Sequence, residues 1–142
     1  MARFDPTRPD FSPYGFSCVR WTATAMPRCD RHNEVELNLL ESGKLVYLMR
    51  GRRVDVHAGR LTVFWAGVPH QVLDFEGLTD YFVLTIPLVW FLQWRLPDHF
   101  TQAILHGATI VEPNVSRLAP DRARFAAWSD DVRIGSEERR HA

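Results

Sequence analysis

The sequence predicts a mainly β protein: a small antiparallel barrel of short strands, followed by two or three helices. Three observations lead to this expectation. Polar and apolar residues alternate along several short segments, which is the period of a strand with two unlike faces. Gly43, Gly51 and Gly59 separate these segments, as expected of turns. After Pro87, large apolar residues recur at spacings of three and four, the period of a helix.

The expected strands follow one another closely along the chain. Gly51 and Arg52 form the expected tight turn between the third and the fourth strand. Pro27 ends the first strand, and Pro87 ends the last strand before the helices. The strands cover residues 19–25, 34–40, 44–50, 53–57, 61–65, 70–75 and 80–86, and residues 109–111 are expected to return to the sheet.

Aromatic residues mark the first expected helix, at residues 88–95. Trp90, Phe91 and Trp94 stand at helical spacing and are interpreted as core anchors, an exposed interface for a partner being the minority alternative. A last helix is expected over residues 120–132, where an apolar stripe also recurs at spacings of three and four.

A short helix is expected between these two. Asp98 is its expected N-cap, and the helix runs to His106 and stops at Gly107. The predicted organisation is therefore an N-terminal arm at residues 1–20, a barrel with short helices at 21–115, and a C-terminal helix with a polar tail at 116–142.

One expected strand carries most of the polar residues of interest. From residue 34 to residue 40 the even positions are mainly polar, and His32 has the same parity. Two interpretations compete: an open strand whose polar side meets water, or a small barrel whose polar side encloses a ligand. Periodicity alone favours the first. The residues that would share this face are His32, Glu34, Glu36 and Asn38.

The spacing around this strand resembles the two motifs of the cupin fold. Motif one, H-x-H-x3-E-x6-G, corresponds to Asp30-x-His32-x3-Glu36-x6-Gly43, with Asp30 in place of the first histidine. Motif two, G-x5-P-x-G-x2-H, corresponds to Gly59, Gly67 and His70, with Trp65 in place of the proline. The resemblance implies a cupin barrel, that is, a jelly-roll-like double-stranded β-helix, and therefore favours the enclosed pocket.

Longer strings resemble the sensor domain of AraC-type transcription regulators. They are VELN, LTVFWAGVPHQ, PLVWFLQWRLP and the following HG, and the resemblance covers roughly residues 20–112. It implies a domain that binds a small-molecule effector, often a sugar, and that is attached to a DNA-binding region of two helix-turn-helix units. It also implies that an N-terminal arm can fold over the ligand. The arm aromatics Phe4, Phe11, Tyr14 and Phe16 are then expected to form a lid.

The polar residues of the motifs suit either a metal ion or a carbohydrate. Nitrogen and carboxylate ligands fit a divalent ion such as Zn, Ni, Fe or Mn, and His32, Glu36 and His70, with Asp30 at the rim, are the expected ligands. Glu34 and Asn38 then support them. The same groups offer donors and acceptors to sugar hydroxyls, and Trp65, Trp21 or Tyr47 offer a stacking face. Sugar-sensing relatives require no metal.

Composition sets further bounds. The chain has 142 residues, is 46% hydrophobic, and its 17 Lys and Arg balance its 17 Asp and Glu. One domain of this size buries a sizeable core without disulfides, and no basic excess points to DNA binding by this domain itself. Cys18 and Cys29 suit a reducing cytoplasm, and no apolar segment is long enough for a signal peptide or a membrane span.

Two classes of function remain. The first is a non-enzymatic effector-sensing domain, acting as a homodimer and reaching DNA only through a separate domain. The second is a small metal-dependent cupin enzyme, such as an isomerase or a dioxygenase. The incomplete ligand set and the FWA-x-x-PHQ string favour the sensor, with no catalytic residue assigned.

Overall fold

The computed structural model describes residues 2–112. The expected helix at 120–132 and the tail lie outside the described residues. The elements, in chain order, are β1 (Ser17–Thr22), β2 (Glu34–Leu39), β3 (Lys44–Met49), β4 (Arg52–His57), β5 (Thr62–Trp65), β6 (His70–Glu76), β7 (Asp80–Pro87), α1 (Leu88–Gln93), α2 (Asp98–Leu105) and β8 (Ile110–Val111).

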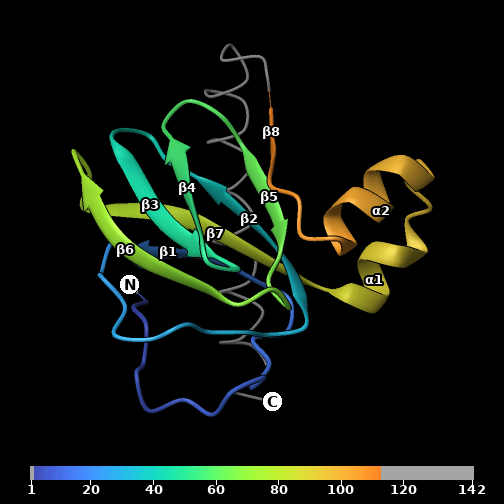
Figure 1. The fold of residues 1–142 in the computed structure, drawn as a ribbon, viewed down its shortest axis with the longest axis horizontal. Coiled ribbons are helices and arrows are strands. Elements are labelled where there is room, and N and C mark those ends of the chain that lie inside the picture. Colours follow the sequence, from blue (N-terminus) through green and yellow to red (C-terminus); the bar gives the residue numbers. More distant parts are fainter. Residues whose placement is uncertain (1, 113–142) are drawn as a thin grey trace, which may run out of the picture.

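The strands form two antiparallel sheets that pack against each other (Figure 1). The larger sheet has the order β1-β7-β2-β5-β8 and the smaller one the order β4-β3-β6. The two ladders are separate, and an isolated antiparallel bridge pairs Asp30, in the segment before β2, with His70 at the start of β6. The architecture is therefore the expected one, a mainly β, cupin-like fold with a jelly-roll-like pair of sheets and two described helices.

The inner faces of the two sheets enclose the first part of the core. Leu45, Tyr47, Phe64 and Val72 belong to this cluster and are all at most 3% exposed. Strand β2 contributes its polar side to the same interior. His32 before it, and Glu34, Glu36 and Asn38 along it, are 1%, 3%, 7% and 0% exposed. The polar face of β2 thus points inward, as the enclosed-pocket interpretation requires.

The outer face of the larger sheet is covered by α1 and α2, which lie together to the right of the strands in Figure 1. Phe91 and Ile104 are buried there. Trp90 and Trp94, in contrast, are 50% and 55% exposed. The interpretation of all three aromatics as core anchors was therefore wrong for the two tryptophans. Helical spacing places residues on a stripe, but a helix of only six residues buries a narrow one.

Some element ends differ from those expected. Pro97, not Asp98, is the N-cap of α2, and Asp98 is the first residue of the helix, where its carboxylate suits the positive end of the helix dipole. Gly107 follows the helix with φ of +93°, as expected of a C-terminal glycine. The hairpin loop is Arg50–Gly51, one residue earlier than expected, with positive φ at both positions. Within residues 2–112 no helix is both long and apolar enough to cross a membrane.

The N-terminal stretch lies along the outside of the strands before the chain enters β1. Ala2 forms a bridge with Trp21 of β1, in which its N–H donates to the carbonyl of Arg20 at 3.0 Å and its carbonyl accepts from Thr22 at 2.7 Å. The expected first strand at 19–25 is observed at Ser17–Thr22. Between these points the arm crosses below the sheets in the view of Figure 1.

Candidate functional site

A small pocket lies between the two sheets, at the end where Asp30 and His70 pair. Its volume is only about 40 Å³, enough for a few water molecules or an ion. The walls come from both sheets and from the arm. They include Phe4 and Tyr14 of the arm, Trp21 of β1, the polar residues Asp30, His32, Glu36 and His70, and Tyr47, Tyr81 and Thr85 of the strands.

The two histidines are each held by a hydrogen bond at Nδ1. His70 Nδ1 lies 2.8 Å from the carbonyl oxygen of Val68, so Nδ1 carries the proton and Nε2 is left as an acceptor. His32 Nδ1 lies 3.1 Å from Glu34 Oε1 and His32 Nε2 lies 3.4 Å from Glu36 Oε1. The two rings stand edge to face, with centroids 5.3 Å apart. Both imidazoles are therefore fixed in orientation.

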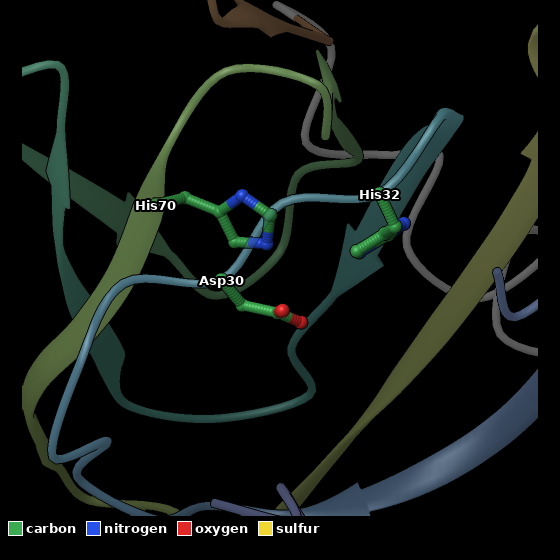
Figure 2. Close-up of side chains that lie close together, drawn as sticks. All are labelled: Asp30, His32 and His70. Carbon is green, nitrogen blue, oxygen red and sulfur yellow. The ribbon is translucent and has the colours of Figure 1, made fainter. Parts of the chain in front are cut away.

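Asp30 is placed next to His70 by the backbone. The Asp30 N–H donates to the His70 carbonyl at 2.8 Å, and the His70 N–H donates to the Asp30 carbonyl at 3.1 Å. Figure 2 shows the three side chains facing a common space. One ligand atom each from Asp30, His32 and His70 lies within 4.8 Å of the others. The two cupin-like motifs are far apart in the sequence, and the fold thus brings Asp30 and His32 of the first motif next to His70 of the second.

Hydrogen bonds continue from Glu36 into the core. Asn38 Nδ2 donates to Glu36 Oε2 at 2.9 Å, and the Tyr47 hydroxyl donates to Asn38 Oδ1 at 2.7 Å. All three residues are buried. Because each polar group in this series of hydrogen bonds has a partner, the hydrogen bonds offset the cost of removing these groups from water. The same series fixes the Glu36 carboxylate next to His32.

Electrostatics make this pocket polar and charged. Burial opposes a charge on His32, but Glu34 and Glu36 outweigh it through hydrogen bonds and their negative charges, and raise the pKa of His32 to about 9. Burial acts the other way on the two carboxyls, yet contact with His32 keeps the pKa of each below its usual value. Burial lowers the pKa of His70. At neutral pH the pocket therefore holds one protonated and one neutral imidazole.

The arm closes this pocket with Tyr14, one of the four expected lid aromatics, and with Arg8, which was not expected there. Arg8 Nε donates to both Asp30 oxygens, at 3.1 Å and 3.2 Å. The Arg8 guanidinium also stacks on the Tyr14 ring, 4.0 Å from its centre. The Tyr14 N–H donates to Glu34 Oε1 at 2.9 Å. The Tyr14 ring meets His32 edge-on, with centroids 4.8 Å apart. The arm thus lies in the pocket mouth.

Of the expected site residues, six line the pocket. They are Asp30, His32, Glu36, His70, Trp21 and Tyr47. Glu34 and Asn38 lie behind them and bond to His32 and Glu36. Trp65 lies elsewhere: it packs on the outer side of the larger sheet and its Nε1 donates to Asn33. Successive residues of a strand point to opposite faces, so Phe64 takes the inward position and Trp65 cannot stack on a ligand.

Asp30, which was expected at the rim of the pocket, lines it and is only 2% exposed, because Arg8 of the arm covers its carboxylate. Several residues were not identified from the sequence, among them Tyr81 and Thr85 in the pocket wall and Arg8, which bonds to Asp30. Tyr81 and Thr85 share an alternating face of β7, which is a usable signal. Arg8 lies in a proline-rich stretch without periodicity and gives no such signal.

The donor set fits a divalent ion. The residues grouped closely enough to be candidate ligands of one ion are Asp30, His32 and His70, and they offer two imidazole nitrogens and a carboxylate oxygen, a mixture that suits zinc, nickel, iron or manganese. Both histidines are also anchored at the other ring nitrogen by a carbonyl or a carboxylate, which is how metal-binding histidines are normally held. His32 would have to give up its proton to bind the ion.

Fold and pocket define this chain as a small cupin-like binding domain whose polar site is closed by its own N-terminal arm. Its sequence is 29% identical over 113 residues, 80% of the chain, to the melibiose operon regulatory protein of Escherichia coli strain K12. The same protein of strain CFT073 matches equally. This is distant homology to an AraC-family regulator. The chain spans only 37% of the length of these relatives. No family model matches it.

Proposed function

We propose that this chain is the effector-sensing domain of a transcription regulator, and that its pocket binds a small polyhydroxylated molecule, a sugar. The observation that carries the proposal is the polar face of β2, buried inside the fold where a structural core would be apolar. Buried charges are retained where they hold a ligand or a partner. Homology to a regulator of the melibiose operon supports the same function.

Sugar chemistry suits the residues that line the pocket. Carboxylates of Asp30 and Glu36 accept hydrogen bonds from vicinal hydroxyls, and His70 Nε2 is a further acceptor. Trp21 and Tyr14 stand edge to face at 5.7 Å and offer apolar surface to a sugar ring. A cavity of about 40 Å³ is far below the ~300 Å³ or more of ordinary ligand sites. A sugar therefore enters only when the arm moves outward.

A divalent cation is a second ligand of the same pocket, although none is required for sensing. His32, Glu36, His70 and Asp30 are the residues that would hold zinc, nickel, iron or manganese. When bound, the ion supplies a positive charge that binds and polarises oxygen ligands. Neighbouring residues orient the two imidazole rings that would bind the ion, because Glu34 holds His32 and the Val68 carbonyl holds His70.

The wider role of the protein follows from the regulator homology. We propose that DNA is bound through a separate domain, since this chain has no net charge with which to neutralise phosphates. We also propose a cytoplasmic homodimer. The apolar side chains that α1 and its end leave exposed support self-association, namely Val89, Trp90, Leu92 and Trp94. Sedimentation of the Trp90→Ser variant at several concentrations tests this part, and an unchanged mass would contradict it.

Thermal unfolding with added sugars tests the effector pocket. A ligand that binds only the folded state raises the midpoint, by the equivalent of roughly 2.7 kcal/mol at 100 times Kd. We expect melibiose to raise it. Trp21→Phe, within the pocket, should reduce the shift, whereas Trp65→Phe, on the outer face, should leave it unchanged. Equal shifts in both variants, or none with a panel of mono- and disaccharides, would refute a sugar site here.

The enzyme alternative rests on the same histidines and carboxylates. We propose instead that the chain catalyses no reaction, because the curated relatives it matches are regulatory proteins and the mouth of the pocket is occupied by the arm. Incubation with each candidate metal and with sugar phosphates or small organic acids tests this. Turnover that disappears in His70→Ala would overturn it.

A further inference from the structure

We infer that Arg8 and a divalent cation compete for the Asp30 carboxylate, so that binding of the cation releases the N-terminal arm. This rests on the proposed function of the pocket as a ligand site and concerns its regulation. In the structure, the arm supplies its own cation to the site. The inference starts from that contact.

The contact between Arg8 and Asp30 is buried, and several hydrogen bonds hold the Arg8 side chain in place. The Arg8 side chain is 9% exposed and that of Asp30 is 3% exposed. Arg8 Nε is shared between both carboxylate oxygens, while Arg8 Nη2 donates to the Ser12 carbonyl of the arm. A second arginine, Arg28, reaches Asp30 only at 4.0 Å and instead donates to the Arg8 carbonyl at 2.5 Å. Arg8 is thus the closest positive charge to this carboxylate.

As they now lie, the ligand groups of Asp30, His32 and His70 are slightly too far apart to bind one ion together. Two atoms bound to one ion at about 2.1 Å are at most about 4.2 Å apart. The ligand atoms of Asp30, His32 and His70 spread over up to 4.8 Å. Their backbones are fixed, because Asp30 and His70 pair in the sheet. A metal therefore closes the set only if at least one of these side chains moves, and any shift of the Asp30 carboxylate disturbs the bonds that Arg8 Nε makes to both of its oxygens.

Charge acts in the same direction. A guanidinium does not lose its proton in a protein, so Arg8 cannot become neutral to make room for a second cation. A divalent ion between Asp30 and the histidines would face this fixed charge at short range, inside a site that excludes most water. Binding of the ion and docking of Arg8 therefore oppose each other, and the opposition is reciprocal.

The rest of the arm depends on this contact. Around Arg8, the arm is attached by the cation–π contact with Tyr14 and by the hydrogen bond from Tyr14 to Glu34. Farther out, Arg31 pairs with Asp10, and both of these side chains are substantially exposed. Exposed pairs contribute little. Loss of the buried Arg8 contact is thus expected to loosen residues 8–14, which include Tyr14.

Zinc titration in competition with a chromophoric chelator measures the first half of the inference. We expect Arg8→Gln to bind zinc at least tenfold more tightly than the unmodified chain, and Arg8→Lys, which keeps the charge but loses the shared Nε, to lie between them. Arg31→Gln is the matched control, since it removes another arginine that pairs with the arm and whose side chain makes no ion pair with Asp30, and should stay within twofold. Circular dichroism confirms that each variant is folded before titration.

Limited chymotrypsin digestion measures the second half. Cleavage after Tyr14, followed by mass spectrometry, should be several-fold faster with zinc than with EDTA, and magnesium should have no effect. The inference is overturned if Arg8→Gln binds zinc no more tightly than the unmodified chain. It is also overturned if zinc slows the cleavage, or if neither protein binds zinc. The last result leaves the sugar site intact, because melibiose binding is measured separately.

Discussion

Raising the pH from 6.5 to 9 should destabilise the metal-free chain through a single residue, His32. Its pKa is about 9 in the folded state against an ordinary value of 6.5. The folded protein therefore holds a proton that the unfolded chain has released, and stability falls as pH rises through this window. The His32 contribution is complete below pH 6.5 and is lost above pH 9. The difference, 9 − 6.5 = 2.5, corresponds to at most about 3 kcal/mol at 1.36 kcal/mol for each unit.

Other shifted groups contribute elsewhere on the pH scale. Glu34 and Glu36 have lowered pKa values, so their contribution is present above pH 4.5 and is lost as the pH falls. The lowered pKa of His70 likewise acts only below 6.5. Burial raises the pKa of Tyr14 to about 12 from 10, which acts only above the window. Burial also raises the pKa of Cys18 to about 11 from 9.0, so this thiol begins to contribute near pH 9, and the interval between pH 6.5 and about pH 8 isolates His32.

Urea denaturation in EDTA at several pH values measures the effect. The free energy of unfolding of the unmodified chain should decline steadily, by no more than about 3 kcal/mol, with an unchanged m value. His32→Gln cannot titrate and should give a nearly flat profile. A flat profile for the unmodified chain, or an equal slope in His32→Gln, would show that His32 is not held protonated by its two carboxylates.

Two further substitution pairs test other parts of the fold. Gly43→Ala should cost well over about 1 kcal/mol, because φ is +69° and the new Cβ would lie 2.1 Å from the Glu76 carbonyl oxygen. Gly51→Ala, with φ of +76° but nothing within 4 Å, should cost only about 1 kcal/mol, and equal losses in urea denaturation would contradict the clash. Phe91→Ala should lower the free energy of unfolding by about 3–5 kcal/mol, whereas Trp94→Ala should lower it by less than about 1 kcal/mol. If the melting temperatures of Phe91→Ala and Trp94→Ala fell equally, this would contradict the conclusion that Phe91 is buried and Trp94 is not.

Most of the fold could be predicted from local patterns in the sequence. Alternation along residues 34–40 predicted β2, and the motif spacing indicated which side of it points inward. The same spacing brought His32, Glu36 and His70 to one pocket. These features depend on backbone period and on turns, which neighbouring residues determine. The sequence is therefore informative where polar and apolar residues alternate along a strand, as they do in β2.

Side-chain contacts between distant segments could not be predicted in this way. Arg8 reaches Asp30 across 22 positions, from a stretch with no secondary structure to give it a direction. Phe64 and Trp65 are adjacent on a strand with apolar residues on both faces, so composition did not reveal which one points inward. Trp90 and Phe91 posed the same difficulty on a helix, where burial depends on how α1 docks.

The backbone pairing of Asp30 with His70 has a consequence for how this pocket can change by mutation. The main chain fixes where the side chain at position 30 starts, whatever that side chain is. Codons for aspartate and histidine differ by a single base, and Asp30→His would restore the first histidine of the cupin motif. That one transversion would place a third imidazole beside His32 and His70 and would remove the anchor of Arg8. A pocket closed by Arg8 and an open pocket with three histidines are thus separated by a single nucleotide change.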